Sequence, residues 1–65
     1  MQYIYVFDYT FGHIYEIALT KKVYENEVKQ DVEKYLRKHY NMKAEQISYL
    51  CPNHKLKIKR IEQIK

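Results

Sequence analysis

The chain has 65 residues, with 12 Lys and Arg against 8 Asp and Glu, so its formal net charge at pH 7 is +4. A domain of this length buries only about 60% of its unfolded surface, and its core rarely supplies more than about 3–5 kcal/mol. The single cysteine excludes an internal disulfide, and no apolar run approaches the roughly 18 residues of a membrane span. The sequence predicts one domain, residues 1–65, of a cytoplasmic protein with no membrane segment, which is stabilised by a dimer or a bound partner.

Residues 2–9 are predicted to form a strand with two apolar faces. Tyr3, Tyr5 and Phe7 alternate with Ile4 and Val6. Because successive side chains of a strand point to opposite faces, both faces are lined by residues that water does not favour. One short helix cannot cover both faces, so we expect the uncovered face to bind a partner.

The segment Thr10–Gly12 predicts a hairpin between this strand and a second one. It ends in the only glycine of the chain, which suits a type I turn followed by a left-handed residue. This turn would place Tyr9 opposite His13 and Tyr5 opposite Ile17. The hairpin should therefore have one aromatic face and one face with fewer aromatic residues.

We expect the aromatic face to pack under the helix, and its members are Tyr3, Tyr5, Phe7 and Tyr15. The opposite face would then be open to a partner. Its apolar residues form the predicted protein interface: Ile4, Val6, Ile14 and Ala18.

Residues 26–40 have the apolar spacing of an amphipathic helix. Asn26 is the predicted N-cap, and Asn41 is predicted to end the helix in the left-handed conformation. The side that faces the sheet should consist of Val32, Tyr35 and Leu36, and the side that faces water of Lys29, Glu33 and Arg37.

Two further strands are predicted in the C-terminal third of the chain. A third strand is predicted where Ile47, Tyr49 and Cys51 alternate with Ser48 and Leu50, and a turn at Pro52 and Asn53 follows. Leu56 and Ile58 then alternate with lysines, which predicts a fourth strand. The spacing of the isoleucines in 61–65 fits both the end of a strand and a helical turn.

These elements predict an α+β domain of the ββαββ type, with one helix packed on one face of a mostly antiparallel four-stranded sheet. The first strand is the most apolar and should be central, whereas the lysine-rich fourth strand suits a sheet edge. The favoured strand order is 2-1-3-4. A β-grasp-like order, with the fourth strand parallel to the first, is the alternative.

The functional expectation is a non-enzymatic protein-interaction module that uses its sheet surface for self-association or for binding a protein partner. Tyrosine serves interfaces well, because it buries a large ring and keeps a hydroxyl for hydrogen bonding. Cys51 and His54 have the spacing of half a zinc site, but a second half is missing, and a buried structural cysteine is the simpler interpretation. We expect no catalytic residues, no metal and no cofactor.

The alternative is a nucleic-acid-binding protein that uses the basic C-terminal strand. On a strand, Lys55, Lys57 and Lys59 would project from one face, roughly 6–7 Å apart, where they could contact phosphates. Arg60 would extend this row, and Tyr49 is the nearest tyrosine that could stack on a base. A competing interpretation is that the lysines only protect the edge of the sheet from aggregation.

Overall fold

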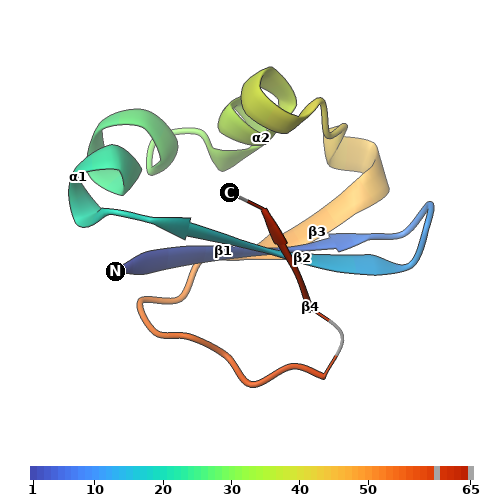
Figure 1. Cartoon of the computed structure of the whole chain (residues 1–65). Coiled ribbons are helices and arrows are strands. Elements are labelled where there is room, and N and C mark those ends of the chain that lie inside the picture. The colour runs from blue at the N-terminus through green and yellow to red at the C-terminus, as the bar shows by residue number, and fades with distance from the viewer. Residues whose placement is uncertain (60, 65) are drawn as a thin grey trace.

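The computed structural model describes residues 1–59 and 61–64, and for 61–64 the backbone alone. The strands β1 (Gln2–Asp8) and β2 (His13–Leu19) form an antiparallel hairpin. The strand β3 (Ile47–Leu50) is antiparallel to β1, and β4 (Ile61–Ile64) is parallel to β2. The order in the sheet is β3-β1-β2-β4. The helices lie on one side of the sheet, and the segment 51–59 passes along the other side (Figure 1).

The predicted ββαββ layout, with one helix on a mostly antiparallel four-stranded sheet, is wrong. The antiparallel part of the sheet has three strands, β3-β1-β2, and two helical regions cover it. The segment around Leu56 and Ile58 is not a strand. Neither the order 2-1-3-4 nor the β-grasp-like order is found, because β4 pairs with β2 and not with β3 or β1. The central position of β1 is confirmed.

The predicted helix over residues 26–40 is divided into two. The first region is α1 (Lys21–Val23), which continues as a π-helix, η1 (Tyr24–Val28), and the second is α2 (Val32–Tyr40). Asn26 is not an N-cap. Thr20 Oγ1 accepts from the Val23 N–H at 3.2 Å, and Asp31 Oδ1 accepts from the Lys34 N–H at 3.0 Å. Asp31 therefore starts a separate helix where the apolar spacing indicated a continuous one.

The end and the faces of α2 agree with the sequence. Asn41 has a φ of 57°, and its N–H bonds to carbonyls of the last turn, which confirms the left-handed cap. The side that faces the sheet consists of Leu36, which is buried, and Val32 and Tyr35, which are half-buried. Glu33 and Arg37 on α2 are exposed as predicted, and so is Lys29, which lies before this helix. A single 3-10 turn, η2 (Ala44–Gln46), leads into β3, and no helix among the described residues is long and apolar enough to cross a membrane.

The core is aliphatic and lies between the sheet and the helices. Its fully or almost fully buried members are Ile4, Val6, Ile17, Leu19, Val28 and Leu36. Of the aromatic face that was expected under the helix, Tyr15 packs against this core, but for Tyr3, Tyr5 and Phe7, which lie on the opposite side of the sheet, the expectation is wrong. We call this opposite side of the sheet the outer face, and it also carries Ile14, Glu16 and Ala18.

The cause of this difference is the register of the hairpin. Asp8 pairs with His13, so the connecting loop is 9–12, one residue longer than the predicted turn. A shift by one residue moves every side chain of β2 to the other face. Ile17 thereby joins Ile4 and Val6, which makes theirs the more aliphatic face and the better partner for the helices.

Candidate functional site

The four residues of the predicted interface do not share one surface. Ile4 and Val6 have exposed fractions of 0% and lie in the core. Ile14 and Ala18 lie on the outer face, on the opposite side of β2 from the buried Ile17. Ile14 is half-buried and Ala18 is exposed. On the β1–β2 hairpin, the surface that stays open to a partner is thus formed by parts of the outer face and by the turn.

Hydrogen bonds to Asp8 hold the β1–β2 turn in place. The Oδ1 atom of Asp8 accepts from the backbone N–H of Thr10 at 2.8 Å and from that of Phe11 at 3.4 Å. The backbone carbonyl of Asp8 accepts from the N–H of Gly12 at 2.9 Å. Gly12 has a φ of 69°, which glycine adopts without steric cost. The turn is therefore ordered by its own bonds before any partner is present.

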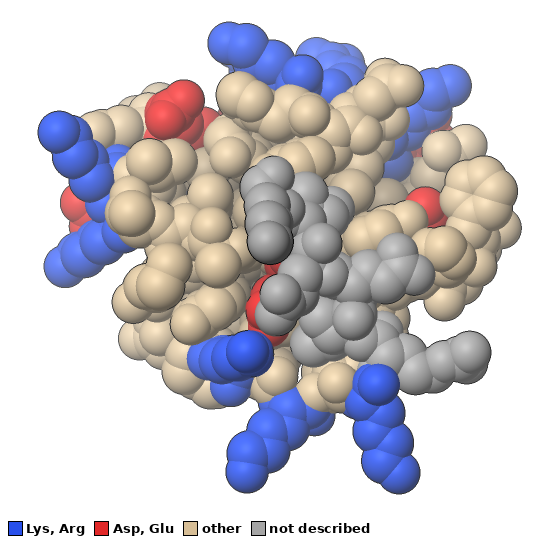
Figure 2. Space-filling view, in the orientation of Figure 1, with Lys and Arg blue, Asp and Glu red and all other residues tan. Residues whose placement is uncertain are grey.

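This ordered turn displays aromatic side chains to water. Tyr9 is 68% exposed and Phe11 is 72% exposed, and His13 is exposed beside them. The rings of Phe11 and His13 are 6.2 Å apart, and those of His13 and Tyr15 are 5.8 Å apart. We call Tyr9, Phe11 and His13 the aromatic tip. Residues 1–20 contain no Lys or Arg, and the margin of Figure 2 where Figure 1 places the turn is largely uncharged.

The sequence did not single out the aromatic tip, although a signal for it was present. Turns normally use Gly, Pro, Asn, Asp and Ser, yet here Tyr9 and Phe11 flank Thr10 in a turn. The prediction placed Tyr9 on the strand and used Phe11 only as a turn position. Turn formation does not explain two large aromatic residues in one exposed loop.

The centre of the outer face is closed by a polar contact. Tyr5 is 0% exposed, and its hydroxyl donates to Glu16 Oε2 at 2.7 Å and accepts from the Leu56 N–H at 2.8 Å. Burial, followed by the hydrogen bond to Glu16, raises the pKa of the Tyr5 hydroxyl. Glu16 is itself only 4% exposed. This contact joins the segment 51–59 to the sheet, so the middle of the outer face is not free for a partner.

The basic residues of the predicted nucleic-acid site lie on this segment. Lys55, Lys57 and Lys59 are exposed, whereas Leu56 and Ile58 between them are half-buried. The alternation that predicted a strand therefore reflects a chain that turns its apolar side chains to the molecule and its lysines to water. Lys and Arg side chains project from the lower margin of Figure 2, where Figure 1 places this segment.

The other two residues of that predicted site do not join the lysines. Tyr49 pairs with Val6 in the sheet and packs against the core on the helix-covered face. Its half-buried ring is on the opposite side of the sheet from the segment 51–59, and burial raises the pKa of its hydroxyl. Arg60 lies outside the described residues.

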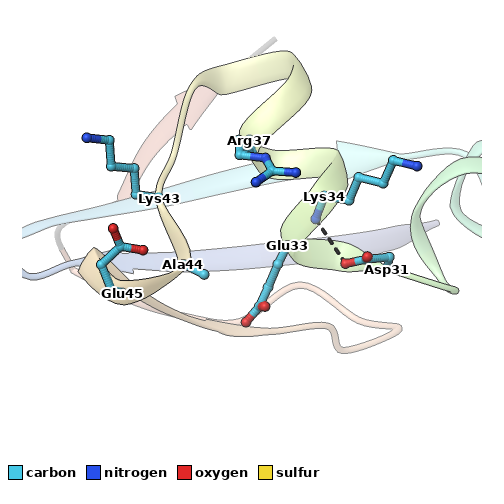
Figure 3. A pocket seen from close by; sticks show the side chains of 7 residues that line it. All are labelled: Asp31, Glu33, Lys34, Arg37, Lys43, Ala44 and Glu45. Atoms are coloured by element: carbon cyan, nitrogen blue, oxygen red, sulfur yellow. Dashed lines mark hydrogen bonds between the residues drawn. The ribbon is translucent and has the colours of Figure 1, made fainter.

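A depression between α2 and the η2 turn does not bring polar groups together at one point. It is lined by Asp31, Glu33, Lys34, Arg37, Lys43, Ala44 and Glu45. Figure 3 shows that these side chains diverge: Glu33 and Lys43, for example, point away from each other. Asp31 is already engaged as the cap of α2. A catalytic site would need polar groups aimed at one point.

Cys51 and the histidines do not form a metal site in the described part of the chain. Among residues 1–59, no group of three or more His, Cys, Asp or Glu lies close enough to hold a metal ion. The thiol of Cys51 is half-buried, and desolvation raises its pKa. A raised pKa leaves less thiolate at neutral pH, which disfavours a role as nucleophile.

No protein-family model, curated protein or solved structure matches this chain.

Proposed function

We propose that this protein is a non-enzymatic interaction module that binds a protein partner through the aromatic tip. The observation that carries the proposal is the exposure of Tyr9 and Phe11, at 68% and 72%, on a turn that is ordered by Asp8. Large aromatic residues dominate binding energy at protein interfaces. Fully burying one such side chain is worth about 1.5–3 kcal/mol.

The order of the turn supports binding as the reason for this exposure. A loop that is already fixed loses little conformational freedom when it binds, so more of the contact energy appears as affinity. The charge of the tip favours a protein over a nucleic acid. Residues 1–20 carry the acids Asp8 and Glu16 and contain no Lys or Arg that could neutralise a phosphate. The matching partner surface is an apolar pocket that accepts a ring.

A photo-crosslinker at the tip tests this proposal directly. A benzophenone amino acid at position 11 keeps an aromatic side chain there, and the same group at Lys38, exposed on α2, is the matched control. In a lysate of the cells that make the protein, we expect one covalent adduct from position 11 that excess wild-type chain removes, and none from position 38. Tyr9→Ser or Phe11→Ser should weaken binding of the captured partner by at least about tenfold each. Equal labelling from both positions would refute the role of the tip.

A second function, nucleic-acid binding, is favoured by the exposed lysines of the segment 51–59. If Lys55, Lys57 and Lys59 each displace a counterion from single-stranded RNA or DNA, log affinity should fall with log salt at a slope of roughly −2. Lys57→Glu/Lys59→Glu should flatten that slope by roughly one to two units, and Lys38→Glu on α2 should leave it unchanged. Fluorescence anisotropy with labelled oligonucleotides measures this, and absence of binding at roughly tens of micromolar protein would exclude this function.

A further inference from the structure

The strand β3 forms one edge of the sheet, and its register shows which backbone groups point outward. The N–H of Tyr9 donates to the carbonyl of Gln46 at 3.0 Å, and the N–H of Tyr3 donates to that of Pro52 at 3.1 Å. In an antiparallel ladder, hydrogen-bonded pairs alternate with non-bonded pairs. Gln46 and Pro52 thus both bond to β1 or to the residue that follows it. Ser48 and Leu50 are the second and fourth residues after Gln46, so they also direct their backbone groups towards β1.

The alternate residues, Ile47 and Tyr49, direct their backbone groups away from β1, and so does the N–H of Cys51. The carbonyl of Cys51 instead accepts from Nε2 of Gln2 in β1 at 2.9 Å. The N–H of Ile47 is used by the η2 turn, where it donates to the carbonyl of Ala44. The groups that remain along this edge, within the described part of the chain, are the N–H and the carbonyl of Tyr49, the N–H of Cys51 and the carbonyl of Ile47.

This set of groups is self-complementary, and we propose that two copies of this chain pair through their β3 edges in antiparallel orientation. With Tyr49 opposite Tyr49 of the second copy, the N–H of each donates to the carbonyl of the other. The same register places the N–H of Cys51 of each copy opposite the carbonyl of Ile47 of the other copy. The pairing does not require the N–H of Ile47, which already donates to the carbonyl of Ala44. The pairing would join both sheets into one.

The side chains of β3 are those expected of an edge strand that pairs with another strand. Exposed edge strands usually carry lysine, an inward charge or a bulge that prevents pairing, and Ile47–Leu50 contains none of these. Pro52 does not block the outer edge, because its position in the ladder faces β1. Leu50 is 53% exposed. In the dimer it lies opposite Ser48 of the second copy and diagonal to Leu50 of that copy, close enough for contact.

The charges on either side of β3 are also complementary in this arrangement. Glu45 precedes the strand and Lys55 follows it, and both are exposed. An antiparallel pair brings Glu45 of each copy towards Lys55 of the other. A second copy is thus favoured over an unrelated peptide as the occupant of this edge. The inference does not depend on the aromatic tip, which lies on the turn between β1 and β2.

The mass of the protein in solution tests the inference. A four-residue strand buries a small area, so we expect a dissociation constant on the order of 10–100 µM and a mass that rises with concentration from 8.1 kDa towards twice that value. Ser48→Lys/Leu50→Lys places lysines opposite each other across the two copies and should keep the protein monomeric. Ala18→Lys, at an exposed position of β2 on the same face, and Phe11→Ser should leave the dimer intact. A wild-type monomer at roughly 1 mM, or a dimer that only Ala18→Lys or Phe11→Ser disrupts, would overturn the proposal.

A mixed-disulfide experiment tests the register independently of those variants. In a Cys51→Ser background, a Ser48→Cys chain is mixed with a Leu50→Cys chain under mild oxidation. The proposed pairing places these two positions opposite each other, so the mixed disulfide should form several times more than either homodisulfide. Leu50→Cys mixed with Ala18→Cys is the control and should give no such excess. A yield no greater than in this control would reject the register.

Discussion

Replacing Leu36 by alanine should unfold most of the protein at room temperature. Leu36 is the one fully buried residue that α2 contributes to the described core, and it packs between the helix and the aliphatic face of the sheet. Truncating a buried leucine costs about 2–5 kcal/mol. A domain of this length rarely has more than about 3–5 kcal/mol in total. Urea denaturation followed by circular dichroism measures the loss.

The adjacent residue provides the control for this substitution. Arg37 is exposed on the same helical turn, and arginine and alanine have similar helix propensities. Arg37→Ala should therefore change the free energy of unfolding by less than about 0.5 kcal/mol. If Leu36→Ala shifts the thermal midpoint by no more than Arg37→Ala does, α2 does not anchor the core.

Replacing Tyr5 by phenylalanine should cost about 2–4 kcal/mol, although the ring and its packing are kept. The change removes the hydroxyl that donates to the Glu16 carboxylate at 2.7 Å and accepts from the Leu56 N–H at 2.8 Å. Hydrogen bonds to charged groups are worth about 1.5–3 kcal/mol, and a buried group left unsatisfied adds its own desolvation cost. Hydrogen exchange of the Leu56 amide should accelerate together with the loss of stability.

Two comparisons separate the hydroxyl of Tyr5 from a general effect of the substitution. Tyr3→Phe alters a neighbouring ring of the outer face, which stacks on Tyr5 with ring centres 6.2 Å apart, and should cost less than about 0.5 kcal/mol. In a double-mutant cycle, Tyr5→Phe and Glu16→Gln should show a coupling energy above about 0.5 kcal/mol. Equal costs for Tyr3→Phe and Tyr5→Phe, with no coupling, would show that the contact does not hold the segment 51–59.

The parts of the fold that the sequence predicts correctly depend on local patterns. The first three strands follow from alternation, and the sheet-facing side of α2 follows from helical spacing around Leu36. Asn41 could be assigned to the left-handed cap because that conformation favours very few residue types. Each of these features is decided by residues a few positions apart.

The features that the sequence does not predict depend on single side chains or on distant strands. The register of the hairpin is decided by Asp8, whose hydrogen bonds to Thr10 and Phe11 stabilise a longer loop than the glycine alone suggested. The place of β4 beside β2 is decided by pairing between residues more than forty positions apart along the chain. No local pattern in 61–64 contains that information.

The same limit applies to the candidate site. The predicted interface followed from the wrong register, so it combined the buried Ile4 and Val6 with Ile14 and Ala18 of the other face. The prediction that the second face of the first strand stays open for a partner is wrong at its centre, where Tyr5 is 0% exposed. The second cover of β1 is the chain itself, because the segment 51–59 closes over Tyr5.

The path of the segment 51–59 also bears on the order in which the protein folds. This segment carries the chain across the sheet from β3 at one edge to β4 at the other. The β1–β2 hairpin closes a short loop, whereas the β2–β4 pair must close a very long one, so it forms late. The hydrogen bond between the Tyr5 hydroxyl and the Leu56 N–H therefore belongs to the part of the structure that we expect to form last.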